Sequence, residues 1–407
     1  MIRKITINQL RKGMYVHDLN CGWLDQMFLW SAFLVSSESI LRQIHALGIQ
    51  ELYIDTDKGS DVASAQTQAE VEQELDDALN TIAKDYSNEL PELSLSSEQR
   101  VAADIRTEAT SLIQSLMDDI RLGRSLDAEQ VTPVVEKLTE SILRNQDALL
   151  GLQRIRHSDL YTFEHSVNVS VLMVAFSKSL ELDQRMIKEL GLGALLHDIG
   201  KTLTPKEILN KPGRLTEPEF KRMQHHVDDG ERILSQAQAI PASAVKIVSE
   251  HHEKIDGSGY PHGKSGSEIS LYGQMASIVD VYDAITSDRV YHRGLEPSEA
   301  LRKLLEWSNY HFAPKLVQQF IRCVGIYPIG TLVRLTSGRI AAVVESSRSG
   351  LLKPVVRICF DPRQQRHLAF EDLDLSDPSI SANERILRAE QARNVPIDIQ
   401  QVMSAIV

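Results

Sequence analysis

Histidines and carboxylates follow apolar helical stretches through the middle of this chain, and this pattern limits its fold more than any other feature. Between Ala128 and Cys323 apolar residues recur at helical spacing, interrupted by loops rich in Pro and Gly such as LNKPGRLTEPE. In GLGALLHDIGK, residues 191–201, a His and an Asp directly follow the apolar run. The polar residues are therefore expected to point into a helical bundle rather than into solvent.

Seven polar residues share this kind of position: His165, His197, Asp198, His226, His251, His252 and Asp280. A single histidine after an apolar stretch is more often a satisfied or exposed residue than a ligand. Five imidazoles and two carboxylates in one bundle, however, would leave buried polar atoms without partners, which is costly. A metal site would use their lone pairs, so the sequence predicts one.

The ligand types limit the metal. Imidazole and carboxylate without thiolate suit iron, manganese, nickel, cobalt or zinc, and a carboxylate can bridge two ions. Asp198 is the natural bridge, with ions about 3.5 to 4 Å apart, which is the geometry that serves phosphoester hydrolysis. A bridging water in such a site loses a proton near neutral pH, so hydroxide can attack phosphorus in line.

The run HDIGK at 197–201, the pair HH at 251–252 and DGSGYP at 256–261 resemble the HD superfamily of metal-dependent phosphohydrolases, specifically its HD-GYP branch. The resemblance extends in order from DLYTFEHSVNVS to FAPKLV. It implies an all-α domain that hydrolyses the bacterial second messenger cyclic di-GMP to linear pGpG, and in some members to GMP. The first 60 residues resemble a domain of unknown function often found ahead of such catalytic domains.

The resemblance implies two divalent transition metals, iron or manganese first, with nickel, cobalt or zinc as alternatives. One metal's ligands match His165, His197, Asp198 and Asp280, and the other's match Asp198, His226, His251 and His252. Within the pair 225–226, His226 is chosen because the family's ligand lies four residues before a Gly, here Gly230.

The resemblance also implies residues for catalysis and substrate binding. Lys201 matches the lysine beside the scissile phosphate, acting with the bridge Asp198; the alternative is a solvated lysine at a helix end. The signature loop consists of Gly259, Tyr260 and Pro261, which either contact the substrate or only shape the wall of the site, and Asp256 is expected to organise it. Arg289 matches a basic residue that meets phosphate or guanine, with a surface ion pair as the alternative.

Two departures from the family pattern matter. Some members hold a third metal through a glutamate four residues before the first histidine, where this chain has Tyr161; Glu164 would face elsewhere on the helix. A two-metal site is therefore predicted. In RVYHR, His292 replaces the usual basic residue, although Arg293 is adjacent, so the family's basic clamp is matched incompletely. A weaker clamp would lower the affinity for substrate before it abolished hydrolysis.

Two other functions compete with an active phosphodiesterase. A receptor would bind cyclic di-GMP, hydrolyse it slowly and pass the signal to a partner. Another HD phosphohydrolase would act on nucleoside triphosphates or alarmones, which explains the metals but leaves the GYP loop unexplained. The complete ligand set and Lys201 favour the phosphodiesterase.

The predicted fold class is multidomain, with an all-α HD-type helical bundle at 128–325 as the catalytic core. A small α+β domain at 1–60 and a helical connector at 61–127 precede it, and a small β appendage at 326–378 and a polar tail at 379–407 follow. The connector is either packed on its neighbours or a dimerising, signal-relaying coil.

Composition limits the expected binding partners and the cellular location of the protein. A net charge of -12 argues against extended contact with nucleic acid, and no stretch approaches the roughly 18 apolar residues of a membrane span. A cytoplasmic protein is expected, and Cys21, Cys323 and Cys359 are too widely spaced for a zinc pattern. Cyclic di-GMP is the expected partner; homodimers and signalling partners stay open, and no receiver pattern supports control by phosphorylation.

Overall fold

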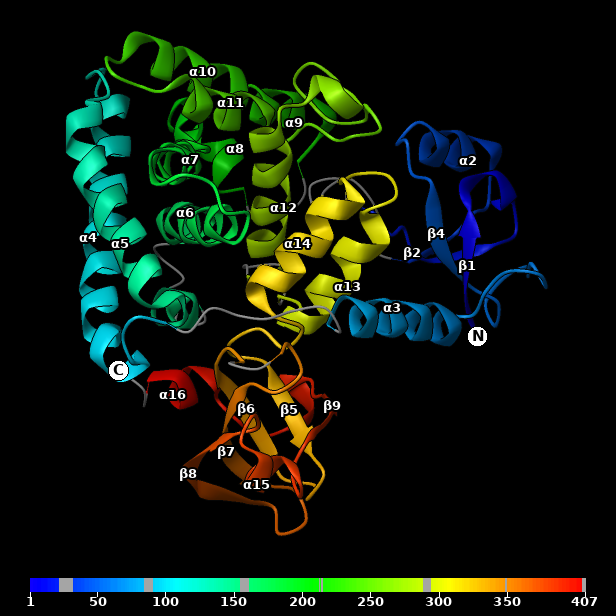
Figure 1. Ribbon diagram of the computed structural model, residues 1–407. Coiled ribbons are helices and arrows are strands. Elements are labelled where there is room, and N and C mark those ends of the chain that lie inside the picture. Colours follow the sequence, from blue (N-terminus) through cyan, green and yellow to red (C-terminus); the bar gives the residue numbers. More distant parts are fainter. Residues whose placement is uncertain are drawn as a thin grey trace. The chain divides into compact units, whose positions relative to one another are not determined.

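The computed structural model describes residues 1–21, 32–83, 91–153, 161–211, 213, 215–287, 294–347 and 350–404. The chain forms two compact units (Figure 1). The first consists of Met1–Asn80 and Pro205–Met223, and the second of Thr81–Thr204 and Gln224–Val407. None of the described helices is long and apolar enough to cross a membrane.

The first unit contains an antiparallel sheet of four strands in the order β1-β4-β2-β3. These strands are β1 (Ile2–Thr6), β2 (Tyr15–Asp18), β3 (Phe33–Leu34) and β4 (Glu51–Asp55). Helix α2 (Glu38–His45) starts where the hydroxyl of Ser37 accepts a hydrogen bond from the Ile40 amide, and its Ile44 joins the apolar core beside the sheet. The predicted α+β domain is confirmed. The unit also includes α8 (Lys206–Leu209) and all of α9 (Glu217–Gln224) except its last residue.

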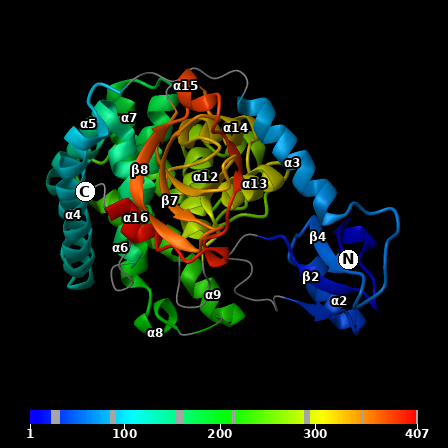
Figure 2. The ribbon, with the colours of Figure 1, turned by 90° about the horizontal axis from the view of Figure 1, so that it is seen from below.

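The second unit is mainly helical, which confirms the predicted all-α core. Figure 2 shows its helices from below. Those that carry or support the polar cluster are α4 (Leu95–Arg121), α5 (Ala128–Leu152), α6 (Tyr161–Ser179), α7 (Gln184–Leu196), α10 (His226–Gln236), α11 (Ala242–Glu250) and α12 (Leu271–Thr286), followed by α13 (Pro297–Trp307) and α14 (Pro314–Val324).

The stretch predicted as a helical connector, 61–127, contains two helices among its described residues. Most of α3 (Gln68–Ala83) belongs to the first unit, whereas α4 belongs to the second and packs along α5 and α6. The buried residues of α4 include Ala102, Ile105, Ala109 and Ile113, spaced three and four apart, as expected for a helix with one face on a core. Helix α4 is therefore packed within the helical unit. This agrees with the alternative in which the connector packs on its neighbours.

After α14 the chain forms an antiparallel sheet of five strands in the order β8-β7-β6-β5-β9. The β appendage predicted at 326–378 contains β5 (Leu332–Leu335), β6 (Ile340–Glu345), β7 (Val355–Asp361) and β8 (Arg366–Asp374). The polar tail predicted from residue 379 is wrong. It contains β9 (Ile386–Ala389), which pairs with β5, and α16 (Ile399–Ser404), which covers one face of the sheet through Val402.

Candidate metal centre

Five helices and one short turn bring the seven predicted ligands together. His165 lies in the first turns of α6, and His197 directly follows α7. Asp198 precedes the 3₁₀ turn η3 (Ile199–Leu203), and His226 begins α10. The pair His251 and His252 follows α11, and Asp280 lies within α12. All seven are buried, and they fall into two groups that could each hold a metal ion: Asp198, His226, His251 and His252 in one, and His165, His197 and Asp280 in the other.

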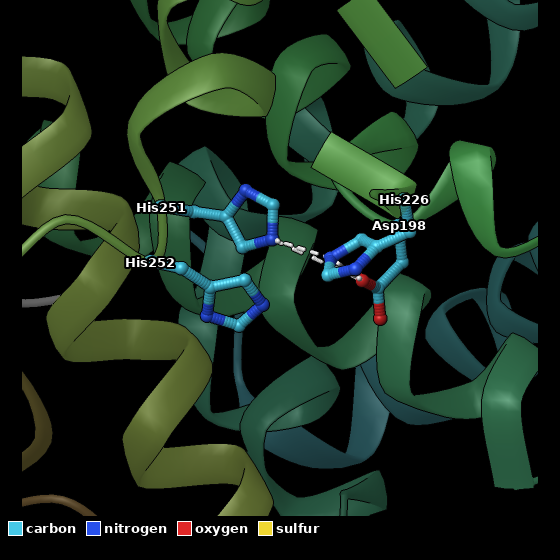
Figure 3. Close-up of side chains that lie close together, drawn as sticks. All are labelled: Asp198, His226, His251 and His252. Carbon is cyan, nitrogen blue, oxygen red and sulfur yellow. Dashed lines mark hydrogen bonds and ion pairs between the residues drawn. The ribbon is translucent and has the colours of Figure 1, made fainter. Parts of the chain in front are cut away.

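Asp198 lies between the two groups and turns one oxygen toward each. Its Oδ2 is 3.3 Å from Nε2 of His197 and 3.8 Å from Nε2 of His165. Its Oδ1 is 3.4 Å from Nε2 of His226 and 3.9 Å from Nε2 of His251. Figure 3 shows the group of Asp198, His226, His251 and His252, with the ring nitrogens of His226 and His251 directed at this carboxylate. A carboxylate placed in this way can contribute one oxygen to each of two ions.

The outer nitrogens of three imidazoles have fixed partners. Nδ1 of His197 lies 2.8 Å from the Ala194 carbonyl oxygen, and Nδ1 of His251 lies 2.9 Å from that of Val248. A carbonyl can only accept, so each Nδ1 carries the proton and each Nε2 presents its lone pair to the cluster. His165 has a carboxylate in this role, described below.

Unpartnered atoms test whether the site fits a metal. Among the described residues, Nε2 of His197, Oδ1 of Asp198 and Nε2 of His252 are buried and form no hydrogen bond. Leaving such atoms unsatisfied costs about 1–3 kcal/mol each. Divalent transition metals prefer these nitrogen and oxygen donors, and one ion in each group would satisfy all three atoms. The residues therefore fit the predicted metals.

The carboxylates are charged at neutral pH. Burial alone would raise the pKa of Asp198, but Lys201 and His197 hold it well below its usual range. Burial would likewise raise the pKa of Asp280, but the hydrogen bond to His165, together with the nearby charges of the cluster histidines, lowers the pKa to about 2. Both groups therefore present the ionised form that binds a cation.

The imidazoles divide into two kinds. Burial, together with His197, lowers the pKa of His251 to about 4, and burial followed by His251 lowers the pKa of His252 well below its usual range. Burial would also lower the pKa of His165, but hydrogen bonds to Asp280 and Asp283 raise it to about 9. The first two are neutral at pH 7, whereas the position of His165 favours positive charge, which a metal ion would supply in place of the proton.

The pentapeptide HDIGK also positions a lysine and a close backbone contact. The ammonium group of Lys201 pairs with Oδ2 of Asp198, and its side chain is partly exposed. A Cβ atom on Gly200 would lie 1.9 Å from the carbonyl oxygen of His226 and 2.5 Å from the amide nitrogen of Gly230. Only glycine therefore permits η3 to approach α10 closely enough to place Asp198 beside His226.

The GYP loop packs directly against the ligands. The Tyr260 ring lies over His252, with centroids 4.6 Å apart and planes inclined by 33°, and its amide donates to the His252 carbonyl oxygen at 3.2 Å. A Cβ atom on Gly259 would lie 2.5 Å from that same carbonyl oxygen. The exposed Asp256 accepts hydrogen bonds from the amide and hydroxyl of Ser258, at 3.0 and 2.6 Å. Pro261 follows Tyr260 in this loop.

Sequence reasoning missed two buried carboxylates. Glu253 is 1% exposed and accepts hydrogen bonds from the amides of His262 and Lys264, at 2.8 and 2.9 Å, so it holds the end of the GYP loop. Asp283 is also 1% exposed and contacts His165. The sequence signals for them were adjacency to the HH pair for Glu253 and a spacing of three residues from Asp280 for Asp283.

The residues considered for the basic clamp lie outside the described residues: Arg289, His292 and Arg293. Glu164 faces away from the cluster, as expected, and pairs with Arg106 of α4 at 3.4 Å.

Comparisons with known proteins find two matching families and several relatives. Residues 2–131 match a family described as a domain of unknown function (DUF3391), and residues 137–316 match the family described as HD domain. A cyclic di-GMP phosphodiesterase of Pseudomonas aeruginosa is 39% identical over 377 residues, which cover 92% of this chain and 89% of that protein.

Two further relatives match less than half of this chain. A cyclic di-GMP phosphodiesterase of Thermotoga maritima is 35% identical over 41% of this chain and 45% of its own length. The 3'3'-cGAMP-specific phosphodiesterase 1 of Vibrio cholerae is 39% identical over 38% of this chain and 36% of its own length. Because the similarity to the Pseudomonas protein covers both matched domains, this chain belongs to the HD-GYP family of cyclic di-GMP phosphodiesterases, with a DUF3391 domain ahead of its HD domain.

Proposed function

We propose that this protein hydrolyses cyclic di-GMP to linear pGpG at a centre of two divalent transition metals, with GMP as a product to be tested. The placement of Asp198 carries the proposal, because its two oxygens face two separate groups of buried ligands. When bound, two such metals polarise the phosphodiester and activate the attacking water. The relatives named as cyclic di-GMP phosphodiesterases support the choice of substrate.

The chain's own residues have distinct roles in this proposal. His165, His197 and Asp280 would hold one ion, with Asp198 shared, and the second would be held by the remaining ligands, His226, His251 and His252. We expect these ions to be iron or manganese, with nickel, cobalt or zinc as alternatives. All seven residues are buried, so the ions would be shielded from bulk water.

Lys201 would offset charge that develops on the phosphate. Its ammonium group already lies at Asp198, and its side chain is 19% exposed, so it is at once near the ligands and accessible from solvent. The GYP loop would form a wall of the substrate site through Gly259, Tyr260 and Pro261, with Asp256 holding the turn. Arg289 stays the proposed basic contact to phosphate or guanine.

A receptor that binds cyclic di-GMP without turning it over is the second candidate. The full ligand set and the contact between Lys201 and Asp198 favour the enzyme, because a receptor needs neither an activated water nor a cation at the scissile phosphate. The purine preference is a separate question, since one relative is specific for 3'3'-cGAMP.

The test is turnover of cyclic di-GMP and of 3'3'-cGAMP by the full chain, reconstituted anaerobically with ferrous iron or with manganese. The same preparations of Asp198→Ala and of Glu306→Gln are compared. Glu306 is a buried carboxylate of α13 that pairs with Lys303 and lies outside the ligand set, so it controls for the loss of a buried charge.

Linear product from the wild type and from Glu306→Gln, with two metals per chain and loss of product in Asp198→Ala, is the expected result. Cyclic di-GMP bound without turnover in either metal form would show a receptor instead. Faster turnover of 3'3'-cGAMP than of cyclic di-GMP would contradict the proposed substrate.

A further inference from the structure

Asp283 is a buried carboxylate behind the metal centre, and the proposed hydrolysis gives it no role. It lies on α12, three residues after Asp280, and is 1% exposed. One of its oxygens is 2.7 Å from Nδ1 of His165, and the other accepts a hydrogen bond from the side-chain amide of Asn168 at 3.2 Å. Because Nε2 of His165 lies 3.1 Å from Asp280, the two carboxylates hold this ring from both of its nitrogens.

The outer nitrogens of the ligand histidines have partners of different charge. His197 and His251 donate to neutral backbone carbonyls. His165 instead faces a full negative charge at its Nδ1. A carbonyl only fixes the ring and its proton, whereas a carboxylate also makes the opposite nitrogen a stronger donor to a metal. His165 is therefore expected to be the most strongly supported of these three ligands.

This difference makes the two groups electrically unequal. The group of His165 and His197 has Asp280 and the shared Asp198 beside it, with Asp283 directly behind. The other group combines three imidazoles with the shared Asp198. More negative charge around one position favours a cation there, and burial reduces the screening of that attraction by water.

We propose that Asp283 is a positioning residue that makes the two metal sites differ in their affinity for metal. It strengthens the binding of the ion held by His165, His197 and Asp280, and it leaves the ion held by the three other histidines largely unaffected. This inference rests on the proposed function, because it takes for granted that two ions share Asp198.

A purely structural role for Asp283 predicts something different. Asp283 links α12 to α6 through Asn168, and its backbone carbonyl accepts from the Ser287 hydroxyl. If that link were all that mattered, removing it would loosen both helices and weaken both ions together. Asn168→Ala is therefore the matched control, since it breaks one of the two side-chain contacts between Asp283 and α6 and leaves the other, with His165, in place.

The experiment is a titration of the metal-free full chain with Mn²⁺, followed by the electron paramagnetic resonance of bound manganese. The variants are Asp283→Ala, Asp283→Asn and Asn168→Ala. We expect Asp283→Ala to weaken one of two sites about 10- to 100-fold and the other by less than about threefold. At intermediate manganese the signal of a coupled pair should then give way to that of a single ion.

Asp283→Asn separates charge from orientation. Its amide oxygen can still accept the Nδ1 proton of His165, so the ring stays in place while the negative charge is lost. A weakening between those of the wild type and Asp283→Ala is expected, and Asn168→Ala should lower thermal stability without separating the two sites.

The outcomes distinguish this inference from the proposed function. A wild type that binds fewer than two manganese ions would overturn the two-metal proposal itself. Two ions in the wild type, with both or neither weakened in Asp283→Ala, would overturn the role of Asp283 while the proposed function stands. Equal effects of Asn168→Ala and Asp283→Ala would also overturn it, because they would reduce Asp283 to a link between helices.

Discussion

Gly200 occupies a position where one added carbon is expected to disrupt the site. The Cβ of an alanine would overlap the carbonyl oxygen of His226 and the amide of Gly230, and both are backbone atoms that cannot rotate away. We expect Gly200→Ala to lower the free energy of unfolding by about 3 kcal/mol, at the upper end of overpacking costs, and to reduce metal content by moving His226 from Asp198. Thermal unfolding and metal analysis of the purified variant check both effects.

The matched control is Gly151→Ala. This glycine lies near the end of α5, and its added Cβ would meet side chains at an ordinary 3.6 Å. Alanine is the better helix former by about 1 kcal/mol, so this variant should be neutral or slightly more stable. A similar loss in both variants would mean that glycine matters for chain flexibility rather than for the close approach.

Glu250 tests the buried charges that support the site. Burial would raise its pKa, but Lys264 and Ser270 outweigh burial and hold the pKa below its usual range. A carboxyl with a lowered pKa in the folded state contributes stability above its unfolded pKa of about 4.5, and this is lost as the pH falls through the folded pKa. Glu250→Gln should therefore cost about 1–3 kcal/mol at pH 7, and progressively less below about pH 4.5.

Chemical denaturation of both proteins from pH 7 to pH 3 measures this difference. Glu108→Gln serves as the control, because Glu108 and Lys137 form an ion pair with both side chains nearly half exposed. Such a pair contributes about 0–1 kcal/mol. A constant difference between wild type and Glu250→Gln at every pH would show that packing, rather than the charge of Glu250, stabilises this corner.

The cluster of seven candidate ligands could be predicted from the sequence, whereas the residues that support it could not. His197 and His226 belong to a series of polar residues that follow apolar helical stretches, and such a series is rare outside metal sites. Asp283 and Glu253, by contrast, are acidic residues in helical or loop sequence, where most such residues are solvated. Only the packing of α6 against α12 shows that Asp283 lies buried at His165.

At the scale of elements, β9 and α16 complete the C-terminal sheet. Strand β9 supplies hydrogen bonds to β5, and Ala392, Val395 and Val402 join the core that contains Leu332. A chain ending at Leu375 would expose the edge of β5 and one apolar face, so we expect a clear loss of thermal stability and new proteolytic cleavage within 326–375. A chain ending at Ser404 keeps these contacts and is the control. Equal protease resistance of the two truncated chains would contradict this role.

The sheet also shows which elements a sequence pattern can reveal. Strands β6 and β7 are largely buried, and their apolar runs predict them. Strand β8 is an edge strand with mostly exposed residues on both faces, so it has no alternation of apolar and polar positions. The stretch predicted as a helical connector, 61–127, contains α3 and α4, but composition did not reveal that these two helices belong largely to different units.

At the scale of the whole molecule, all seven ligands belong to the second unit, so metal binding should stabilise the molecule unevenly. A metal at 100 times its dissociation constant stabilises the folded state by about 2.7 kcal/mol per site. We expect Mn²⁺ to slow hydrogen exchange in α6, α10, α11 and α12, and to leave the amides of β1 and β4 unchanged.

Mass spectrometry with and without metal measures this difference in hydrogen exchange, with Asp198→Ala as the control that should lose the effect. Equal slowing in β1 and β4 would show that the two units unfold together, and no slowing in the four helices would remove the metal centre itself.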